Sequence, residues 1–305
     1  MEIVKTFNLS KYYKGFPALV DANITIEKGD IYGLIGRNGA GKTTLMRIIT
    51  GLTPQSSGEF TLFGINGADP DSRGKLGAIV EAPALYDNFT GIQNLKAAAL
   101  LRGIAPDSPK IKEMLTFAGL DSFGGRKVKN YSLGMRQRLA LAIILLHDPE
   151  FLVLDEPVNG LDPFGIVQTR EILKRLNQEK GVTILISSHL LSELEHLATK
   201  YGIIERGRVI EEISAPALYA KLTKTLEITL NSADIEPAAE LIKIKFGFKV
   251  AVAGSRLLVA DANIDKKTGE INQMLASANI FVQGFHLSVM DLEQYFIRVT
   301  GGGQI

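Results

Sequence analysis

The sequence contains no cysteine among its 305 residues. This absence excludes disulfide frameworks, zinc–thiolate centres and cysteine nucleophiles. The chain also has almost no net charge, because 34 Lys and Arg residues are balanced by 33 Asp and Glu residues. Proteins that cradle nucleic acid usually carry a strong basic excess. We therefore expect no nucleic-acid partner.

Long apolar runs are missing as well. The longest, residues 139–146, is far shorter than the roughly 18–20 residues that a membrane-spanning helix needs. The N-terminal segment, MEIVKTFNLSKYYKG, lacks the apolar stretch of a cleaved secretion signal. We expect a cytoplasmic chain that does not itself cross a membrane, so any membrane role would act through partner chains.

Apolar strands alternate with helical patterns through the first two thirds of the chain. The expected elements are strands at 2–9, 23–26 and 30–35, a helix at 43–50, a mostly helical region at 94–146, strands at 151–154, 183–187 and 201–205, and helices at 166–179 and 190–200. Such alternation predicts a largely parallel sheet that is covered on both faces.

The pattern changes near residue 216. The expected elements from there on are a strand at 226–230, a helix at 237–246, strands at 248–253 and 257–260, a helix at 267–278, a strand at 281–287 and a closing helix at 290–299. The first six follow the ferredoxin-like order of strands and helices. We therefore predict two domains, residues 1–218 and a small α+β C-terminal domain, 219–305.

Residues 36–43 read GRNGAGKT, which matches the phosphate-binding pattern GxxxxGK[ST]. The segment leaves an apolar strand and opens a helix, which is the context that this loop requires. Its glycines let backbone N–H groups surround a phosphate at a helix N-terminus. The predicted nucleotide contacts are Gly36, Asn38, Gly39, Ala40, Gly41, Lys42, Thr43 and Thr44. Among them, Lys42 is expected to reach the β- and γ-phosphates and the Thr43 hydroxyl to bind Mg²⁺.

A phosphate loop alone leaves kinases, GTPases and many ATPases open. The apolar run FLVLDE at residues 151–156 narrows the choice, because it ends in two acids as a Walker B strand does. Asp155 is expected to hold Mg²⁺, directly or through water. Glu156 is placed to polarise the attacking water.

Three further segments carry a family resemblance. YSLGMRQR lies at 131–138, NGLD at 159–162 and SSH at 187–189. Their order relative to the two Walker segments resembles that of the ATP-binding cassette (ABC) ATPases over about residues 2–220. The resemblance implies an α/β P-loop NTPase fold of the ABC type, with a helical subdomain at about 84–148.

The resemblance also implies a role for individual residues. Tyr13 corresponds to the aromatic residue that stacks on adenine, with Tyr12 as the alternative. Glu156 corresponds to the general base. His189 corresponds to the histidine that contacts the γ-phosphate and holds the water and the base in place. The other histidines, at 147, 196 and 286, have no such context and are interpreted as structural.

Other residues are implied to act across a dimer. Ser132 and Gly134 begin the helix that faces the γ-phosphate of the opposite subunit in the family, and Asp162 communicates across the same interface. Two copies of the chain would therefore enclose two molecules of ATP, each with Mg²⁺.

The sequence departs from the family pattern in two places. The signature segment YSLGM lacks the usual middle glycine and glutamine, although Ser132 and Gly134 remain. Glu81 stands where the family usually has glutamine. Its carboxylate can still bind Mg²⁺ or water, but it adds negative charge beside the γ-phosphate. We expect this residue to tune hydrolysis and count it with Thr43 and Asp155 as a metal ligand.

The segments GAIVEAPALYDNFTGIQNL, YSLGMRQRLALA, EPVNGLDPFGI and SSHLLSELE resemble the bacitracin- and lantibiotic-resistance ATPases of bacteria. This resemblance implies the peripheral ATP-hydrolysing subunit of a peptide-antibiotic exporter, at the cytoplasmic face of the cell membrane, with an integral membrane permease as its partner. In the family the permease docks on residues 81–90, which here include Tyr86 and Phe89. The alternative is that this aromatic pair is buried in the helical subdomain.

Two rival functions use the same loop. One is a soluble, non-transport ABC ATPase that acts on ribosomes or DNA. The ribosomal type has two cassettes and the DNA-repair type a long coiled-coil insertion, and this sequence shows neither. The other is a small-molecule P-loop kinase, which leaves the signature segment and His189 unexplained.

Overall fold

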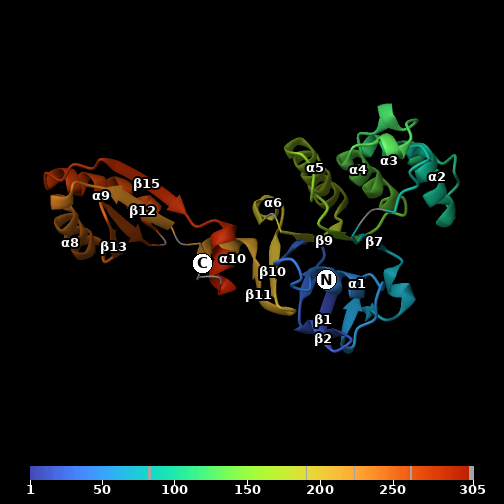
Figure 1. The fold of residues 1–305 in the computed structure, drawn as a ribbon, viewed down its shortest axis with the longest axis horizontal. Coiled ribbons are helices and arrows are strands. Elements are labelled where there is room, and N and C mark those ends of the chain that lie inside the picture. The colour runs from blue at the N-terminus through green and yellow to red at the C-terminus, as the bar shows by residue number, and fades with distance from the viewer. Residues whose placement is uncertain (82–83, 190, 223, 262, 302–305) are drawn as a thin grey trace. The chain divides into compact units, whose positions relative to one another are not determined.

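A computed structural model describes residues 1–81, 84–189, 191–222, 224–261 and 263–301 (Figure 1). The chain separates into two compact units, Met1–Ser214 and Ala215–Ile305. Within the described ranges, every helix is too short or too polar to span a lipid bilayer.

The first unit is built on a six-stranded sheet in the order β11-β10-β4-β9-β8-β7. All neighbouring strands in it are parallel except β10 and β11. The central strands are buried along their whole length, as expected for a sheet covered on both faces. The strands are β4 (Ile31–Ile35), β7 (Leu76–Ile79), β8 (Phe151–Asp155), β9 (Thr183–Ser188), β10 (Lys200–Glu205) and β11 (Arg208–Ser214).

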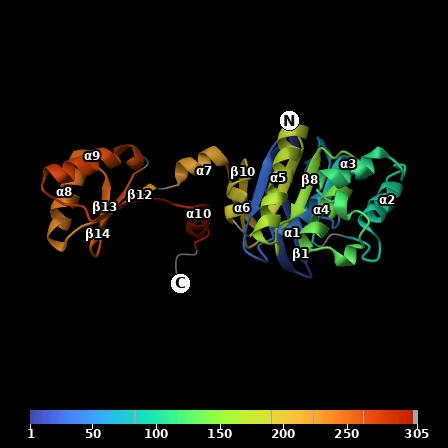
Figure 2. The same cartoon turned by 90° about the horizontal axis from the view of Figure 1, so that it is seen from above.

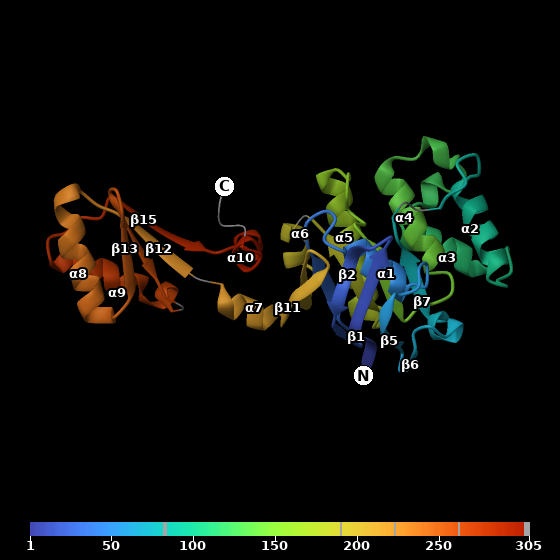
Figure 3. The same ribbon diagram turned by 60° about the horizontal axis from the view of Figure 1, so that its bottom comes forward.

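A second, antiparallel sheet has the order β2-β1-β5-β6, with β3 paired to β1 (Figure 3). Helix α1 (Lys42–Ile49) contributes Leu45, Met46, Ile48 and Ile49 to a core shared by the two sheets. Because α1 packs in this shared core, the position of the loop that precedes it is fixed relative to both sheets. The strands are β1 (Glu2–Tyr13), β2 (Phe16–Ala22), β3 (Thr25–Glu27), β5 (Ser57–Leu62) and β6 (Ile65–Asn66).

Helices cover the opposite side of the parallel sheet. In Figure 1, α5 (Pro163–Lys180) and α6 (Leu191–Glu195) lie on the side of β9 away from α1. Helices α2 (Gly91–Leu101), α3 (Pro109–Phe117) and α4 (Leu133–Ile144) pack on one another as a separate group (Figure 2). Helix α2 begins with a capping box between Thr90 and Gln93, which satisfies N–H groups at its first turn.

The second unit begins with α7 (Ala215–Lys221) and contains an antiparallel sheet in the order β13-β14-β12-β15. Alternate residues of β12, such as Leu226 and Ile228, form a core with the apolar sides of α8 and α9. Ferredoxin-like classification of this unit stays a prediction. Its elements are β12 (Lys224–Thr229), α8 (Ile235–Phe246), β13 (Lys249–Ala253), β14 (Arg256–Ala260), α9 (Ile264–Ser277), β15 (Gly284–Val289) and α10 (Leu292–Val299).

The α/β class predicted from the sequence is confirmed, but several strands were not predicted. These are β2, β5, β6, β7 and β11, each of which has at most two buried residues. In β5, for example, only Phe60 and Leu62 are buried. The helix expected at 190–200 is shorter, because α6 ends at Glu195 and a turn follows it before β10 begins at Lys200. The last strand begins at Gly284 instead of 281, where the Phe281 side chain is exposed.

Candidate nucleotide site

The phosphate loop connects β4 to α1 at the carboxyl end of the parallel sheet. Gly39 and Gly41 have φ angles of +80° and +112°, which favour glycine. A Cβ atom on Gly36 would lie 2.5 Å from the Ile204 carbonyl oxygen, and one on Gly41 would lie 2.7 Å from that of Ala18. Any larger residue at these two positions would therefore displace the loop from the strands behind it.

Lys42 is buried at the start of α1, with its ammonium group directed back over the loop. It donates hydrogen bonds to the carbonyl oxygens of Gly36, at 2.8 Å, and Arg37, at 3.3 Å. Its Nζ also lies 3.5 Å from Glu156 Oε1. A buried cation held by weakly competing carbonyls is well placed to exchange them for phosphate oxygens.

The two acids at the end of β8 have separate partners. The Thr43 hydroxyl donates to Asp155 Oδ2 at 2.7 Å, so the metal-binding pair predicted from the sequence is in contact. Glu156 has a φ of +48°, seldom adopted by residues other than glycine. Its Oε2 lies 2.8 Å from His189 Nδ1, which brings the predicted base and histidine together.

Ser187 is a site residue that the sequence motifs did not predict. Its hydroxyl donates to Asp155 Oδ1 at 2.6 Å and accepts from the Glu156 backbone N–H at 2.9 Å. The side chain is fully buried on β9, directly opposite Asp155 in the strand register. One hydroxyl thus orients both Walker B acids. The SSH segment contained this serine, but only strand pairing shows what it contacts.

A cavity of about 260 Å³ lies beside the phosphate loop. It includes Tyr13 and Phe16, which pair at the end of the β1–β2 hairpin, whereas Tyr12 is absent from its lining. Phe16 is 67% exposed and was not predicted as a site residue. The lining residues are Tyr13, Phe16, Ala18, Asn38, Gly39, Gly41, Lys42, Thr43, Thr44 and Glu156.

Gly36 and Ala40 of the predicted set do not line this cavity. Gly36 is packed against Ile204, and the Ala40 N–H donates to the Arg37 carbonyl at 3.0 Å. Both residues shape the loop from behind. The structure therefore gives them a supporting position, and direct phosphate contact by them stays a prediction.

The residues predicted to act across a dimer begin two helices. The Ser132 hydroxyl caps α4 by accepting from the Met135 N–H at 3.3 Å. Asp162 caps α5 by accepting from the Gly165 N–H at 2.9 Å. Neither residue, nor Gly134, lines the cavity at the phosphate loop of its own chain. Their action on a second copy stays a prediction.

Glu81 follows β7, the strand that pairs with β8. Its carboxylate forms an ion pair with the Arg47 guanidinium on α1, and its φ is +68°. Arg47 lies one helical turn beyond Thr43. Glu81 thus lies at the carboxyl edge of the sheet, paired with a cation that no sequence motif indicates, and metal binding by it stays a prediction.

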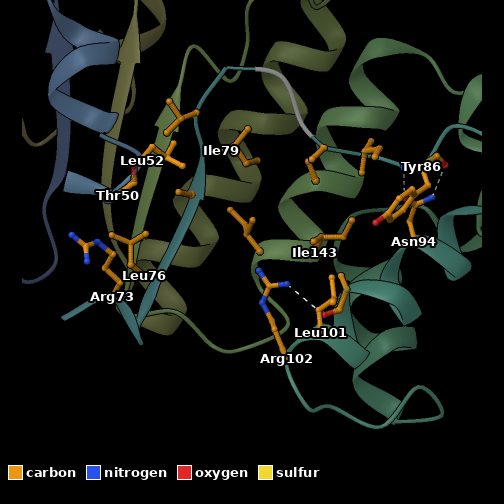
Figure 4. A pocket seen from close by; sticks show the side chains of 17 residues that line it. Thr50, Leu52, Arg73, Leu76, Ile79, Tyr86, Asn94, Leu101, Arg102 and Ile143 are labelled. Carbon is orange, nitrogen blue, oxygen red and sulfur yellow. Dashed lines mark hydrogen bonds between the residues drawn. The ribbon is translucent and has the colours of Figure 1, made fainter. Parts of the chain in front are cut away.

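A second cavity, of about 730 Å³, lies away from the phosphate loop (Figure 4). Its walls are mostly apolar and come from β7, α2 and α4, with Arg73 and Arg102 also in the lining. Burial lowers the pKa of the Arg102 guanidinium. The lining residues are Thr50, Leu52, Arg73, Leu76, Ala78, Ile79, Val80, Ala84, Leu85, Tyr86, Asn94, Ala98, Leu101, Arg102, Ala140, Ile143 and Ile144.

Tyr86 and Phe89 lie at this side of the helical group. Their ring centroids are 5.1 Å apart, and the two residues are 57% and 42% exposed. The alternative that this pair is buried in the helical subdomain is therefore wrong. Asn94 fixes the loop by accepting from the Tyr86 N–H at 2.8 Å and donating to its carbonyl at 3.1 Å. Of the segment 81–90, residues 82 and 83 lie outside the described ranges.

His147 is partly buried near the same helices, at the end of α4. Desolvation by burial lowers its pKa, while a hydrogen bond from Nε2 to the Leu76 carbonyl oxygen, at 3.1 Å, raises it. Among nearby charges, Arg102 and Lys110 lower this pKa and Asp148 raises it. The net effect favours the neutral imidazole.

Comparisons with known proteins agree with this geometry. The profile of the ABC transporter family matches residues 19–159. The bacitracin transport ATP-binding protein BcrA of Enterococcus faecalis is 37% identical over 306 residues, covering 99% of this chain and 98% of that protein. The lantibiotic transport ATP-binding protein SrtF of Streptococcus pyogenes is 45% identical over 210 residues, covering 69% and 90%.

The chain belongs to the ATP-binding subunits of ABC transporters. The fold agrees, since the dimeric ATP-binding cassette MJ0796 bound to ADP and Pi aligns with a TM-score of 0.64 and 26% identity, over 70% of this chain and 98% of that one. This ABC subunit therefore binds and hydrolyses ATP. Its relatives are transport proteins, which favours transport over the soluble, non-transport alternative.

Proposed function

We propose that this ABC subunit drives the export of a peptide antibiotic through a bacterial membrane permease. The supporting observation is the extent of the similarity to the bacitracin transport proteins. Two of them, from Enterococcus faecalis and Bacillus licheniformis, are 37% and 38% identical over 99% of this chain. The similarity thus includes the second unit, which lies outside the ATP-binding cassette.

In the proposed cycle, ATP draws two copies of the subunit together. The loop at residues 36–44 of one copy holds the phosphates, and Ser132 and Gly134 of the other copy contact the γ-phosphate. Three observations support this arrangement. Both residues lie at the start of α4, where N–H groups and the helix dipole favour an anion. Neither lines the cavity of its own chain. A related cassette is dimeric.

Glu156 is the proposed general base. It takes a proton from water as the water oxygen forms a bond to the γ-phosphorus, and the bond from that phosphorus to the bridging oxygen breaks to release ADP. His189 holds Glu156 in position through the contact of 2.8 Å. Lys42 must leave the loop carbonyls to stabilise the phosphate charge.

The residues present fit Mg²⁺. Among the described residues, no group of three or more His, Cys, Asp and Glu side chains forms an all-protein metal cage. The Thr43 hydroxyl and the Asp155 carboxylate, in mutual contact, would instead hold the ion together with phosphate oxygens, a ligand set that suits Mg²⁺. When bound, the ion would neutralise charge that develops on the phosphates.

The permease is proposed to dock at the cavity of about 730 Å³ between β7 and the helical group (Figure 4). Its apolar walls and the exposed pair Tyr86 and Phe89 are suited to an apolar helix face. Docking there would place the subunit peripherally at the cytoplasmic face of the membrane. The second unit is proposed to serve dimerisation or regulation, so deletion of residues after 220 should alter one of these without abolishing nucleotide binding.

Co-purification tests the transport assignment. The tagged chain would be isolated from its native membranes in mild detergent, with mass spectrometry of the bound proteins. A polytopic membrane protein at near-stoichiometric yield is expected, and its removal from the cell should raise sensitivity to a peptide antibiotic. Recovery of ribosomal or DNA-bound proteins, with no membrane protein, would contradict the proposal while leaving the ATPase site intact.

A further inference from the structure

We propose that Arg47 is a positioning residue that controls Glu81. The Arg47 guanidinium forms an ion pair with the Glu81 carboxylate. Through this pair, Arg47 holds the carboxylate away from the phosphates and balances its charge. The inference concerns the nucleotide site alone and does not depend on which substrate is transported.

The strand register places Glu81 close to the reaction site. β7 and β8 are parallel, with Ile79 opposite Leu154 as the last pair. Two residues further along, Glu81 and Glu156 both leave the carboxyl edge of the sheet. Neighbouring strands are about 4.8 Å apart, so this edge brings together three carboxylates, those of Glu81, Asp155 and Glu156.

Each carboxylate has a different partner. Asp155 accepts from Thr43 and Ser187, and Glu156 contacts Lys42 and His189. These partners are already engaged in holding the Walker B acids.

Glu81 is paired instead with Arg47. This cation reaches it from α1, one helical turn after Thr43. The pair thus joins the phosphate-binding helix to the strand end that leads toward residues 84–90.

The backbone conformation of Glu81 indicates that its surroundings constrain it. Glu81 adopts a φ of +68°, in the left-handed region that glutamate seldom occupies. Such strain persists where surrounding contacts hold a residue in place. Arg47 is 35% exposed and the Glu81 side chain 59% exposed, so the pair contributes little to folding stability. We expect the pair to affect the position and the charge balance of Glu81 instead.

The test measures ATP affinity with a fluorescent ATP analogue, with Mg²⁺ and with EDTA, on the full chain. Without Arg47, an unbalanced Glu81 carboxylate repels the free polyphosphate. Arg47→Gln should therefore weaken Mg²⁺-free binding about tenfold, which is the scale of the repulsion between two like charges roughly 10 Å apart in a partly exposed site. The loss should be smaller with Mg²⁺, which carboxylates attract.

The decisive comparison is a double-mutant cycle. In the Glu81→Gln background, Arg47→Gln should change affinity less than about twofold, and Arg47→Lys should restore most of the wild-type value. Lys75→Gln is the matched control, because it removes another exposed ion pair, Lys75–Glu150 at 2.6 Å, away from the loop. It should leave both affinities unchanged.

Two results would overturn the proposal. An equal loss of affinity from Arg47→Gln with Glu81 or Gln at position 81 would mean that Arg47 binds phosphate by itself. No change in either background would mean that the pair has no role in nucleotide binding. Thermal unfolding of each variant shows whether a loss of affinity comes from misfolding.

Discussion

Ser187→Ala is the sharpest test of the site geometry. The Ser187 hydroxyl is the link between the two Walker B acids, because it donates to Asp155 and accepts from the Glu156 N–H. The side chain is fully buried, and alanine would leave too little space for a compensating water. The substitution removes one oxygen atom and no carbon, so loss of apolar packing is minimal.

The expected loss of stability follows from the two groups that lose their hydrogen bond to Ser187, the Asp155 carboxylate and the Glu156 N–H. A buried polar group that loses its hydrogen-bond partner costs about 1–3 kcal/mol. Asp155 keeps its contact with Thr43, so we expect a total loss of about 2–4 kcal/mol in the free energy of unfolding. Because the Glu156 backbone is no longer fixed, kcat should also fall at least about tenfold.

Urea unfolding of the full chain, followed by circular dichroism, together with steady-state ATPase measurements, checks both expectations. Thr169→Val is the matched control. The Thr169 hydroxyl is buried on α5 and has no hydrogen-bond partner among the residues that the structure describes, so its removal should be neutral or slightly stabilising. If Ser187→Ala unfolds at the same urea concentration as Thr169→Val and keeps the wild-type kcat, the assigned role of Ser187 is wrong.

Three further substitutions test other parts of the site. Glu156→Gln should lower ATP hydrolysis by about 10²–10⁴-fold while an ATP-bound dimer accumulates in gel filtration; wild-type turnover would disprove its role as base. Tyr13→Ala should weaken ATP affinity about tenfold in the same fluorescence titration, because base stacking is lost, and Phe16→Ala should weaken it less. Tyr12→Ala is the control and should have no effect, since Tyr12 has a similar exposure but lies outside the cavity. Burial lowers the pKa of His147 in the folded chain. The unfolded chain therefore binds the proton more tightly, and the free energy of unfolding decreases as the pH falls through 6.5, the ordinary pKa of histidine in the unfolded chain. Melting temperatures at pH 7.5 and 5.5 should therefore differ more for wild type than for His147→Gln, and equal differences would contradict this assignment.

Local sequence patterns were sufficient for the main elements of the first unit. Strands β4, β8 and β9 are short, apolar and buried on both faces, so their residues alone indicate a parallel sheet. The phosphate loop is likewise local, because its glycines, Lys42 and Thr43 are contiguous. Strands with weaker alternation were not predicted, since their stability comes from pairing with distant strands. β5 is one example, because it pairs with β1 at the start of the chain.

The amino-acid sequence by itself determined the chemistry: a phosphate loop, two acids after an apolar strand, a histidine after the next strand, and glutamate at position 81. Only the tertiary structure decided which of these groups meet. Ser187 contacts Asp155 because β8 and β9 are in register, and Phe16 joins Tyr13 because a hairpin brings them together. Arg47 reaches Glu81 because α1 and β7 pack against the same apolar core. The contacts of Ser187 and Arg47 join residues that lie far apart in the sequence, so they depend on how distant strands and helices pack, which the separate segments do not reveal.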